Sequence, residues 1–319
     1  MAKKKVKYPW GSTREKVGAL EKLSYANLDF SGQLLATVVN SYLMYFFTDV
    51  AAVSAAATGV ILLLARVVDA VGAPVWGTLI DMTHSKYGKA RPYFLWLAFP
   101  YAASAILLFW APSLSPAAKA IYCGVVYMIY GVLYLGINAP ITTILTLITS
   151  SPAQRVKLNS WRMVGSQLGV FIVNSLTLPL VAFFGGGNDV KGFRIFIVIF
   201  AILNVCGTLF SFSHIRERVV VPNSQRVTLR KSIHAMNKNW PWFLIVIGNF
   251  LFWIAQQGRQ QSLVYYFTYY FHSKGLVTFF NSIAIIQVVG IISIPLLNKY
   301  MSKSHIWALG LAGAVIGQF

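Results

Sequence analysis

The sequence predicts an all-α protein built as a polytopic bundle of membrane-spanning helices. Hydrophobic residues make up 57% of its 319 residues and charged residues only 11%, whereas a soluble domain is roughly 25% charged. Apolar runs of about 20 residues, the length that a helix needs to cross a bilayer, recur along the chain. This composition excludes a soluble enzyme, a disordered chain and a secreted disulfide scaffold. The two cysteines, Cys123 and Cys206, form no CxxC pair, which argues against a zinc or redox motif.

Eight apolar runs are long enough to be full membrane spans. They are predicted at 24–48, 54–80, 92–112, 120–148, 161–184, 193–213, 241–271 and 276–297. A ninth run, 306–319, has 14 residues and reaches only about 21 Å as a helix, less than the ~30 Å hydrocarbon core. We therefore expect the sequence to stop inside a partial ninth span.

Basic residues predict the orientation. The net charge is +19, from 27 Lys and Arg against 8 Asp and Glu. With a cytoplasmic N-terminus, 20 basic residues fall in cytoplasmic segments and four in outer loops, which is the asymmetry typical of membrane proteins. We predict that orientation, and we attribute the charge to topology and not to a nucleic-acid partner. The basic N-terminus is not followed by the short apolar stretch and cleavage site of a signal peptide.

The longest polar stretch divides the chain into two parts. Residues 1–213 are predicted to form an N-terminal six-helix half, 214–240 a central cytoplasmic loop and 241–319 an incomplete C-terminal half. A short basic loop follows the second span of each half, at 84–92 and 298–305. This repetition fits transporters that are built from repeated helical units.

Polar side chains recur along single faces of the predicted spans. Asp29 and Gln33 share a face of the first span, and Arg66 and Asp69 lie three residues apart in the second. A longer stripe runs along the fourth span: Tyr127, Tyr130, Tyr134, Asn138, Thr142, Thr146 and Thr149. The fifth span carries Arg162 and the seventh Gln257.

Two interpretations of these residues compete. Single polar residues in membrane helices commonly form interhelical hydrogen bonds, and Arg66 with Asp69 can equally be a structural ion pair. A seven-residue stripe favours a wet cavity, because a continuous polar face is costly in lipid. For the same reason we expect Asp29 and Arg162 to be functional and to line one cavity.

The chemistry of such a cavity favours a sugar. Hydroxyls, amides and aromatic rings are the groups that bind sugar hydroxyls and the apolar faces of sugar rings. An ion channel would need rings of carbonyls or charges. No metalloprotease, hydrolase, P-loop or dinucleotide motif occurs, and the five histidines lack metal-ligand spacing. The sequence predicts no enzyme, catalytic residue, cofactor or metal site.

Four passages carry a family resemblance: KLSYANLD at 22–29, ARVVDAVGAPVWGTLIDMTHSKYGKARP at 65–92, YGVLYLGINAP at 130–140 and SWRMVGSQLG at 160–169. They resemble the glycoside–pentoside–hexuronide:cation symporter family, the melibiose-permease-like branch of the major facilitator superfamily. The resemblance implies a major-facilitator bundle of twelve spans. This sequence reaches only the ninth span of such a bundle, which implies a C-terminally truncated chain.

The resemblance also implies roles for individual residues. It implies substrate-binding roles for Asp29, Gln33, Tyr134, Asn138, Thr142 and Arg162, of which Thr142 replaces a family aromatic residue. Gln257 is added as a candidate substrate-binding residue from the polar residues of the seventh span, not from the resemblance. Asp69 matches the first carboxylate of a cation site to which the Asn138 position also contributes, and Arg66 is its supporting ion-pair partner. The second carboxylate of that site is replaced by Ala73. Because one carboxylate is a poor sodium cage, the coupling ion is expected to be a proton rather than sodium.

The leading hypothesis is a multi-pass cell-membrane symporter that carries a sugar or glycoside by alternating access, with the lipid bilayer as its surroundings. One alternative is a truncated relative that does not transport. Another is a carrier of an anionic solute such as a uronide, because the predicted spans contain three arginines and only two carboxylates, which leaves one positive charge unbalanced. The sequence does not predict which sugar is bound or the oligomeric state.

Overall fold

The computed structural model describes residues 17–110, 112–219, 239–265, 270, 286–298 and 300–316. Every regular element among them is a helix, and the one β-type pairing is an isolated bridge between Ser85 and Gly88. The chain forms two compact units. The first comprises residues 1–219 and 285–319, and the second comprises 220–284.

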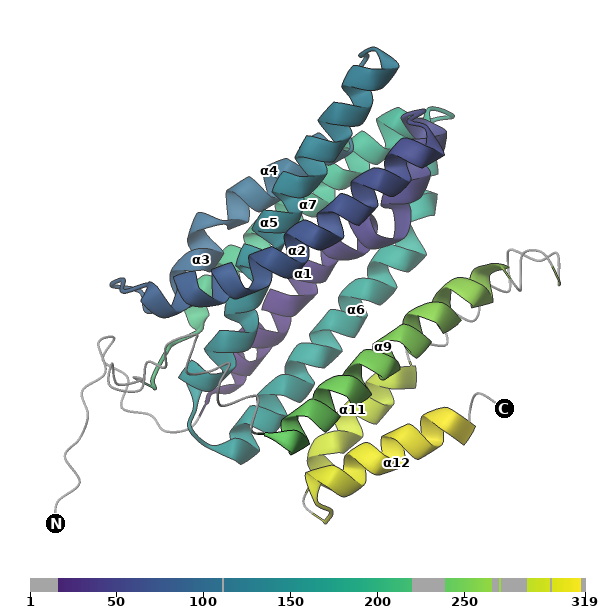
Figure 1. Cartoon of the computed structure of the whole chain (residues 1–319). Coiled ribbons are helices and arrows are strands. Elements are labelled where there is room, and N and C mark those ends of the chain that lie inside the picture. The colour runs from purple at the N-terminus through teal and green to yellow at the C-terminus, as the bar shows by residue number, and fades with distance from the viewer. Residues whose placement is uncertain are drawn as a thin grey trace, which may run out of the picture. The chain divides into compact units, whose positions relative to one another are not determined.

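The first unit holds most of the described helices (Figure 1). They are α1 (Ala19–Tyr45), the π-helical turn η1 (Phe46–Val50), α2 (Ala55–Met82), α3 (Arg91–Trp96), α4 (Ala98–Leu108), α5 (Pro116–Ile148), α6 (Pro152–Gly185), α7 (Asp189–His214), α11 (Ile286–Leu297) and α12 (Lys303–Ile316). The second unit holds α9 (Trp240–Tyr265).

Local sequence sets where these helices begin. Ser54, Ser115 and Asn188 are N-caps whose side chains accept hydrogen bonds from backbone N–H groups of the first turns of α2, α5 and α7. Such caps satisfy donors that have no partner inside the helix. Proline occupies the first position of α5 and of α6, where its missing N–H costs no hydrogen bond.

The predicted single span 92–112 is divided into two helices. The described structure has α3 and α4 separated at Leu97, and α4 ends at Leu108. Pro100 explains the division, because it has no N–H to donate to the carbonyl of Trp96 and its ring crowds that carbonyl. Tyr101 is the fourth residue of α4.

Close packing fixes the rotation of α1 about its own axis. Figure 1 shows α1 beside α6, the helix against which it packs most extensively. Cβ atoms added at Gly165 and Gly169 of α6 would overlap the backbone of α1 at Ala26 and Phe30, so the two glycines allow the helices to approach closely. On the α7 side, the Asn27 amide donates to the carbonyl of Gly207 at 2.8 Å.

Four of the described helices are long and apolar enough to cross a membrane: α2, α5, α6 and α7. Shorter apolar helices are 98–108, 240–255 and 288–297. Part of the predicted eighth span, residues 276–285, lies outside the described residues. The described helices therefore establish a multi-span helical architecture, while the number of eight full spans stays a prediction.

One end of the first unit carries a set of buried charges that we call the charged rim, defined as Glu21, Glu217 and Arg218. The Glu217 carboxylate accepts hydrogen bonds at 2.9 Å from each of three consecutive backbone N–H groups, those of residues 89–91. Glu217 is only 4% exposed. It thus satisfies donors at the start of α3 that would otherwise be buried without a partner.

The other acid of the charged rim joins α1 to the segment that follows α7. Arg218 makes a two-pronged ion pair with Glu21, at 2.7 and 2.6 Å. The backbone N–H groups of Arg218 and Val219 both donate to the carbonyl of Leu147, near the end of α5. The rim therefore connects α1, α3, α5 and α7 at one end of the unit.

Candidate functional site

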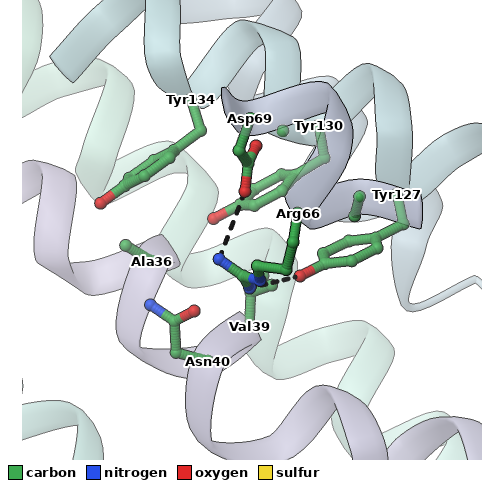
Figure 2. A pocket seen from close by; sticks show the side chains of 10 residues that line it. Ala36, Val39, Asn40, Arg66, Asp69, Tyr127, Tyr130 and Tyr134 are labelled. Atoms are coloured by element: carbon green, nitrogen blue, oxygen red, sulfur yellow. Dashed lines mark hydrogen bonds and ion pairs between the residues drawn. The ribbon is translucent and has the colours of Figure 1, made fainter. Parts of the chain in front are cut away.

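A small cavity lies among α1, α2 and α5 (Figure 2). Its volume is about 40 Å³, enough for one or a few waters. The residues that line it are Ala36, Val39, Asn40, Ala65, Arg66, Asp69, Tyr127, Tyr130, Gly131 and Tyr134. In this conformation the cavity suits waters or an ion, and a sugar would require it to widen.

Arg66 and Asp69 form an ion pair on the wall of this cavity. Nη1 of Arg66 lies 3.2 Å from Oδ2 of Asp69, as their i, i+3 spacing on α2 allows. Nη2 of Arg66 donates to the hydroxyl of Tyr127 at 3.2 Å. Figure 2 shows the guanidinium between the carboxylate and the tyrosine, so that it links α2 to α5.

Tyrosine rings form a ladder along the cavity, which we define as Tyr101, Tyr127, Tyr130 and Tyr134. Neighbouring rings of α5 are almost parallel, with centroids 6.4 Å apart between Tyr127 and Tyr130 and 6.2 Å between Tyr130 and Tyr134. Tyr101 of α4 adds a fourth ring, 5.3 Å from that of Tyr130. The ladder offers flat aromatic faces and hydroxyls together, which are the two groups that sugar recognition uses.

A second ion pair is deeper and looser. Nη1 of Arg162 on α6 lies 3.9 Å from Oδ2 of Asp29 on α1. Asp29 is 7% exposed, and Nε of Arg162 donates to Asn159 at 3.2 Å. At 3.9 Å the contact is longer than a charge-assisted hydrogen bond. Both groups therefore keep hydrogen-bonding capacity that a polar ligand can use.

The stripe on α5 divides into two halves in the structure. Its tyrosines reach the cavity, and the Asn138 side chain interacts with the hydroxyl of Tyr134. Thr142 donates instead to the carbonyl of Ala139, at 2.9 Å, within its own helix. Thr146 likewise donates to the carbonyl of Thr143. The tyrosine half is thus the part that faces the cavity.

The remaining predicted site residues are placed as follows. Gln33 accepts a hydrogen bond from Thr37 at 3.3 Å on α1. Ala73 is exposed one turn after Asp69 and offers no ligand atom. Gln257 belongs to α9, and its side chain lies outside the described residues. Within the described part of the chain, no group of three or more His, Cys, Asp or Glu residues could hold a metal ion.

Sequence reasoning missed two residues of this region. Tyr101 comes from the third predicted span, where no polar stripe marks it. Asn159 lies just before the predicted fifth span and orients Arg162 only because α6 begins earlier, at Pro152. A search for polar residues one turn from each intramembrane charge would have found Asn159. Tyr101 could be found only from the packing of α4 on α5.

Comparison with known proteins identifies the family. A family model described as "MFS/sugar transport protein" matches residues 24–319. The chain is 36% identical over 301 residues to the isoprimeverose transporter of Lactiplantibacillus pentosus, covering 93% of this chain and 63% of that protein. It is 31% identical over 255 residues to the inner membrane symporter YicJ of Escherichia coli strain K12, covering 80% and 55%.

A third relative, the uncharacterized symporter YnaJ of Bacillus subtilis strain 168, is 30% identical over 308 residues, covering 95% of this chain and 66% of that protein. The chain thus spans less than two thirds of the length of these relatives. Their names describe transporters and symporters and not enzymes. With its long apolar helices, the chain is a multi-pass membrane protein, and it belongs to the MFS/sugar transport family.

Proposed function

We propose that the protein is a secondary active transporter that carries a sugar or glycoside across the cell membrane by alternating access. The observation that carries this proposal is the buried Asp29–Arg162 pair, whose 3.9 Å separation leaves hydrogen-bonding capacity on both partners. A carboxylate and a guanidinium this close together can each make two hydrogen bonds to neighbouring sugar hydroxyls. Neither Asp29 nor Arg162 lines the small cavity in this conformation, so the sugar would reach them only once the cavity widens. The aromatic faces of the tyrosine ladder complete the set of groups that a sugar requires.

The proposed architecture follows the predicted spans. Residues 1–213 are the N-terminal six-helix half, 214–240 the central cytoplasmic loop and 241–319 part of the second half, with eight full spans and a partial ninth. The N-terminus is cytoplasmic. In transporters of this type the substrate sits near the middle of the bilayer between two halves that rock against each other. Asp29, Gln33, Tyr134, Asn138, Thr142, Arg162 and Gln257 are the proposed substrate-binding residues.

We further propose that any coupling ion is a proton and not sodium. Hard cations require several oxygen ligands, and the cavity beside Asp69 contains one carboxylate, already paired with Arg66. Asn138 can add one carbonyl oxygen, but Ala73 adds none. A single carboxylate is sufficient for a proton.

The test is a binding measurement on the purified protein in lipid nanodiscs. Isoprimeverose is the first probe, because a relative carries that name, followed by neutral glycosides and a methyl glucuronide. Binding of a neutral sugar supports the proposal. Binding of the glucuronide alone would instead support a carrier of an anionic solute. The predicted spans contain more arginines than carboxylates, and an anionic solute could balance the extra positive charge. Binding of none of these probes contradicts the proposal.

The coupling ion is tested by replacing sodium with choline at constant pH. We expect the sugar affinity to change less than threefold. A tenfold gain in sodium, about 1.4 kcal/mol of coupling free energy, would contradict proton coupling. Because coupling is reciprocal, an ion that tightens sugar binding must itself be bound more tightly when sugar is present.

A further inference from the structure

Tyr101 is buried and does not line the cavity, yet its ring lies beside two residues that do, Tyr130 and Tyr134. It begins the second turn of α4 after the division at Leu97, and it is 0% exposed. Its hydroxyl lies 3.1 Å from that of Tyr130, and either oxygen can be the donor. This is a buried hydrogen bond between α4 and α5.

The hydrogen bond holds the middle ring of the ladder. The ring of Tyr130 lies between those of Tyr127 and Tyr134, at interplanar angles of 13° and 9°. A change in the orientation of the middle ring would therefore alter its contacts with both neighbours, because the three rings are close enough to interact in a close-packed interior. The ring of Tyr101 also lies within 6.3 Å of that of Tyr134.

The two outer rings of the ladder reach different polar groups. The Tyr127 hydroxyl accepts from Arg66 of the Arg66–Asp69 pair, and Tyr134 interacts with Asn138. Figure 2 shows Tyr127, Tyr130 and Tyr134 as successive rungs along one side of the cavity. The orientation of Tyr130 thus affects both the ion-pair end and the amide end of the cavity.

We propose that Tyr101 is a positioning residue for sugar binding: its hydroxyl orients Tyr130 and, through it, the aromatic surface of Tyr134 that a sugar ring contacts. The inference rests on the proposed transport function. Tyr101 itself touches no substrate. Its role is to reduce the number of ring orientations available before the sugar arrives, since pre-organised groups lose less freedom on binding.

The test uses Tyr101→Phe, which keeps the ring and removes one hydroxyl. The probe is isoprimeverose, measured by titration calorimetry with the purified protein in lipid nanodiscs. We expect a measurable loss of affinity with about fivefold, the worth of one whole neutral hydrogen bond, as its upper limit, because only the pre-organising part of the bond enters the affinity. Tyr130→Phe removes the same hydrogen bond from the other side, and we expect it to produce a similar loss.

The double variant Tyr101→Phe with Tyr130→Phe separates positioning from stability. Each single variant leaves one buried hydroxyl without its partner, whereas the double variant leaves none, so its thermal midpoint should recover toward that of the wild type. The affinity should stay as low as in the single variants, because the ring is still not held. Recovery of affinity together with stability would show that the hydrogen bond is only structural and would overturn the proposal.

Tyr122→Phe is the matched control. The Tyr122 hydroxyl also joins α5 to α4, donating to the carbonyl of Leu107 at 2.7 Å, but it lies away from the cavity. We expect this variant to bind isoprimeverose as the wild type does, and an equal loss of affinity here would overturn the proposal. Unchanged affinity in both single variants overturns the role of Tyr101 alone. Absence of sugar binding by the wild type overturns the proposed function together with it.

Discussion

The charged rim and the Asp29–Arg162 pair both join acidic and basic side chains from different segments, but they differ in how much of their hydrogen-bonding capacity is used within the protein. At the rim, Glu21 and Arg218 meet through two contacts of 2.6 and 2.7 Å, and the Glu217 carboxylate accepts from three backbone N–H groups. Near the cavity, Asp29 and Arg162 approach only to 3.9 Å.

This difference separates a stabilising role from a binding role. A buried charge is tolerated when its hydrogen-bonding capacity is used, and the rim acids use theirs within the protein. A buried pair whose capacity is only partly used is costly in a helix bundle, and such residues mark binding sites in membrane proteins. We therefore expect changes at the rim to reduce stability and changes at Asp29 to reduce binding.

The largest expected effect is that of Glu217→Ala. The change removes a buried carboxylate and leaves the N–H groups of residues 89–91 without an acceptor. Each buried donor left without a partner costs about 1–3 kcal/mol, so three of them together make this the largest effect. We expect a strongly lowered thermal midpoint, measured on detergent-purified protein. Glu217→Gln keeps one acceptor oxygen and should fall between the alanine variant and the wild type, and an alanine variant with an unchanged midpoint would show that the rim does not stabilise the fold.

A smaller effect is expected at Gly88, the glycine beside the Glu217 carboxylate. Its φ is +113°, and an added Cβ would overlap that carboxylate. Gly88→Ala should lower the thermal midpoint through backbone strain and through displacement of Glu217, together about 2 kcal/mol.

Gly186→Ala provides the matched control for Gly88→Ala. Gly186 also has a positive φ, +55°, but an added Cβ meets open space there. Its cost should be limited to the backbone term, about 1 kcal/mol. Equal losses at the two positions would mean that contact with Glu217 contributes nothing.

Much of the helical architecture could be predicted from apolar run length alone. The four long apolar helices α2, α5, α6 and α7 each contain most of a predicted span. The division at Leu97 was not predicted, although Pro100 is its visible cause. The starts of α5 and α6 were placed too late, because each helix begins at a proline directly after its N-cap serine, ahead of the apolar run.

The sequence predicted which polar residues belong to the site better than it predicted which of them contact one another. Periodicity identified Asp29, Arg66, Asp69 and the α5 tyrosines, because intramembrane polar groups are rare. Periodicity along one helix cannot show which residue of another helix it meets. For that reason the sequence analysis missed Tyr101, the fourth ring of the ladder, and all three residues of the charged rim. The contact of Asp29 with Arg162 depends on the close approach of α1 and α6, which Gly165 and Gly169 allow.

Asp29→Asn tests the binding role that we propose for the Asp29–Arg162 pair. The amide is nearly the same size as the carboxylate, and the 3.9 Å contact with Arg162 contributes less than a direct charge-assisted hydrogen bond. We therefore expect the thermal midpoint to stay close to that of the wild type. Isoprimeverose affinity should fall at least tenfold, about 1.4 kcal/mol, because a charged acceptor for sugar hydroxyls is lost.

Glu21→Gln is the corresponding change at the rim, and the two variants should show crossed effects. Glu21 accepts two short hydrogen bonds from Arg218, so its replacement leaves a buried guanidinium without a counter-charge and lowers the thermal midpoint. Glu21 belongs to the charged rim and is not among the proposed substrate-binding residues, so sugar affinity should be retained in the folded fraction. If Asp29→Asn lowered the midpoint as much as Glu21→Gln and kept its affinity, the Asp29–Arg162 pair would be structural, and the proposed sugar site would have to lie elsewhere along the tyrosine ladder.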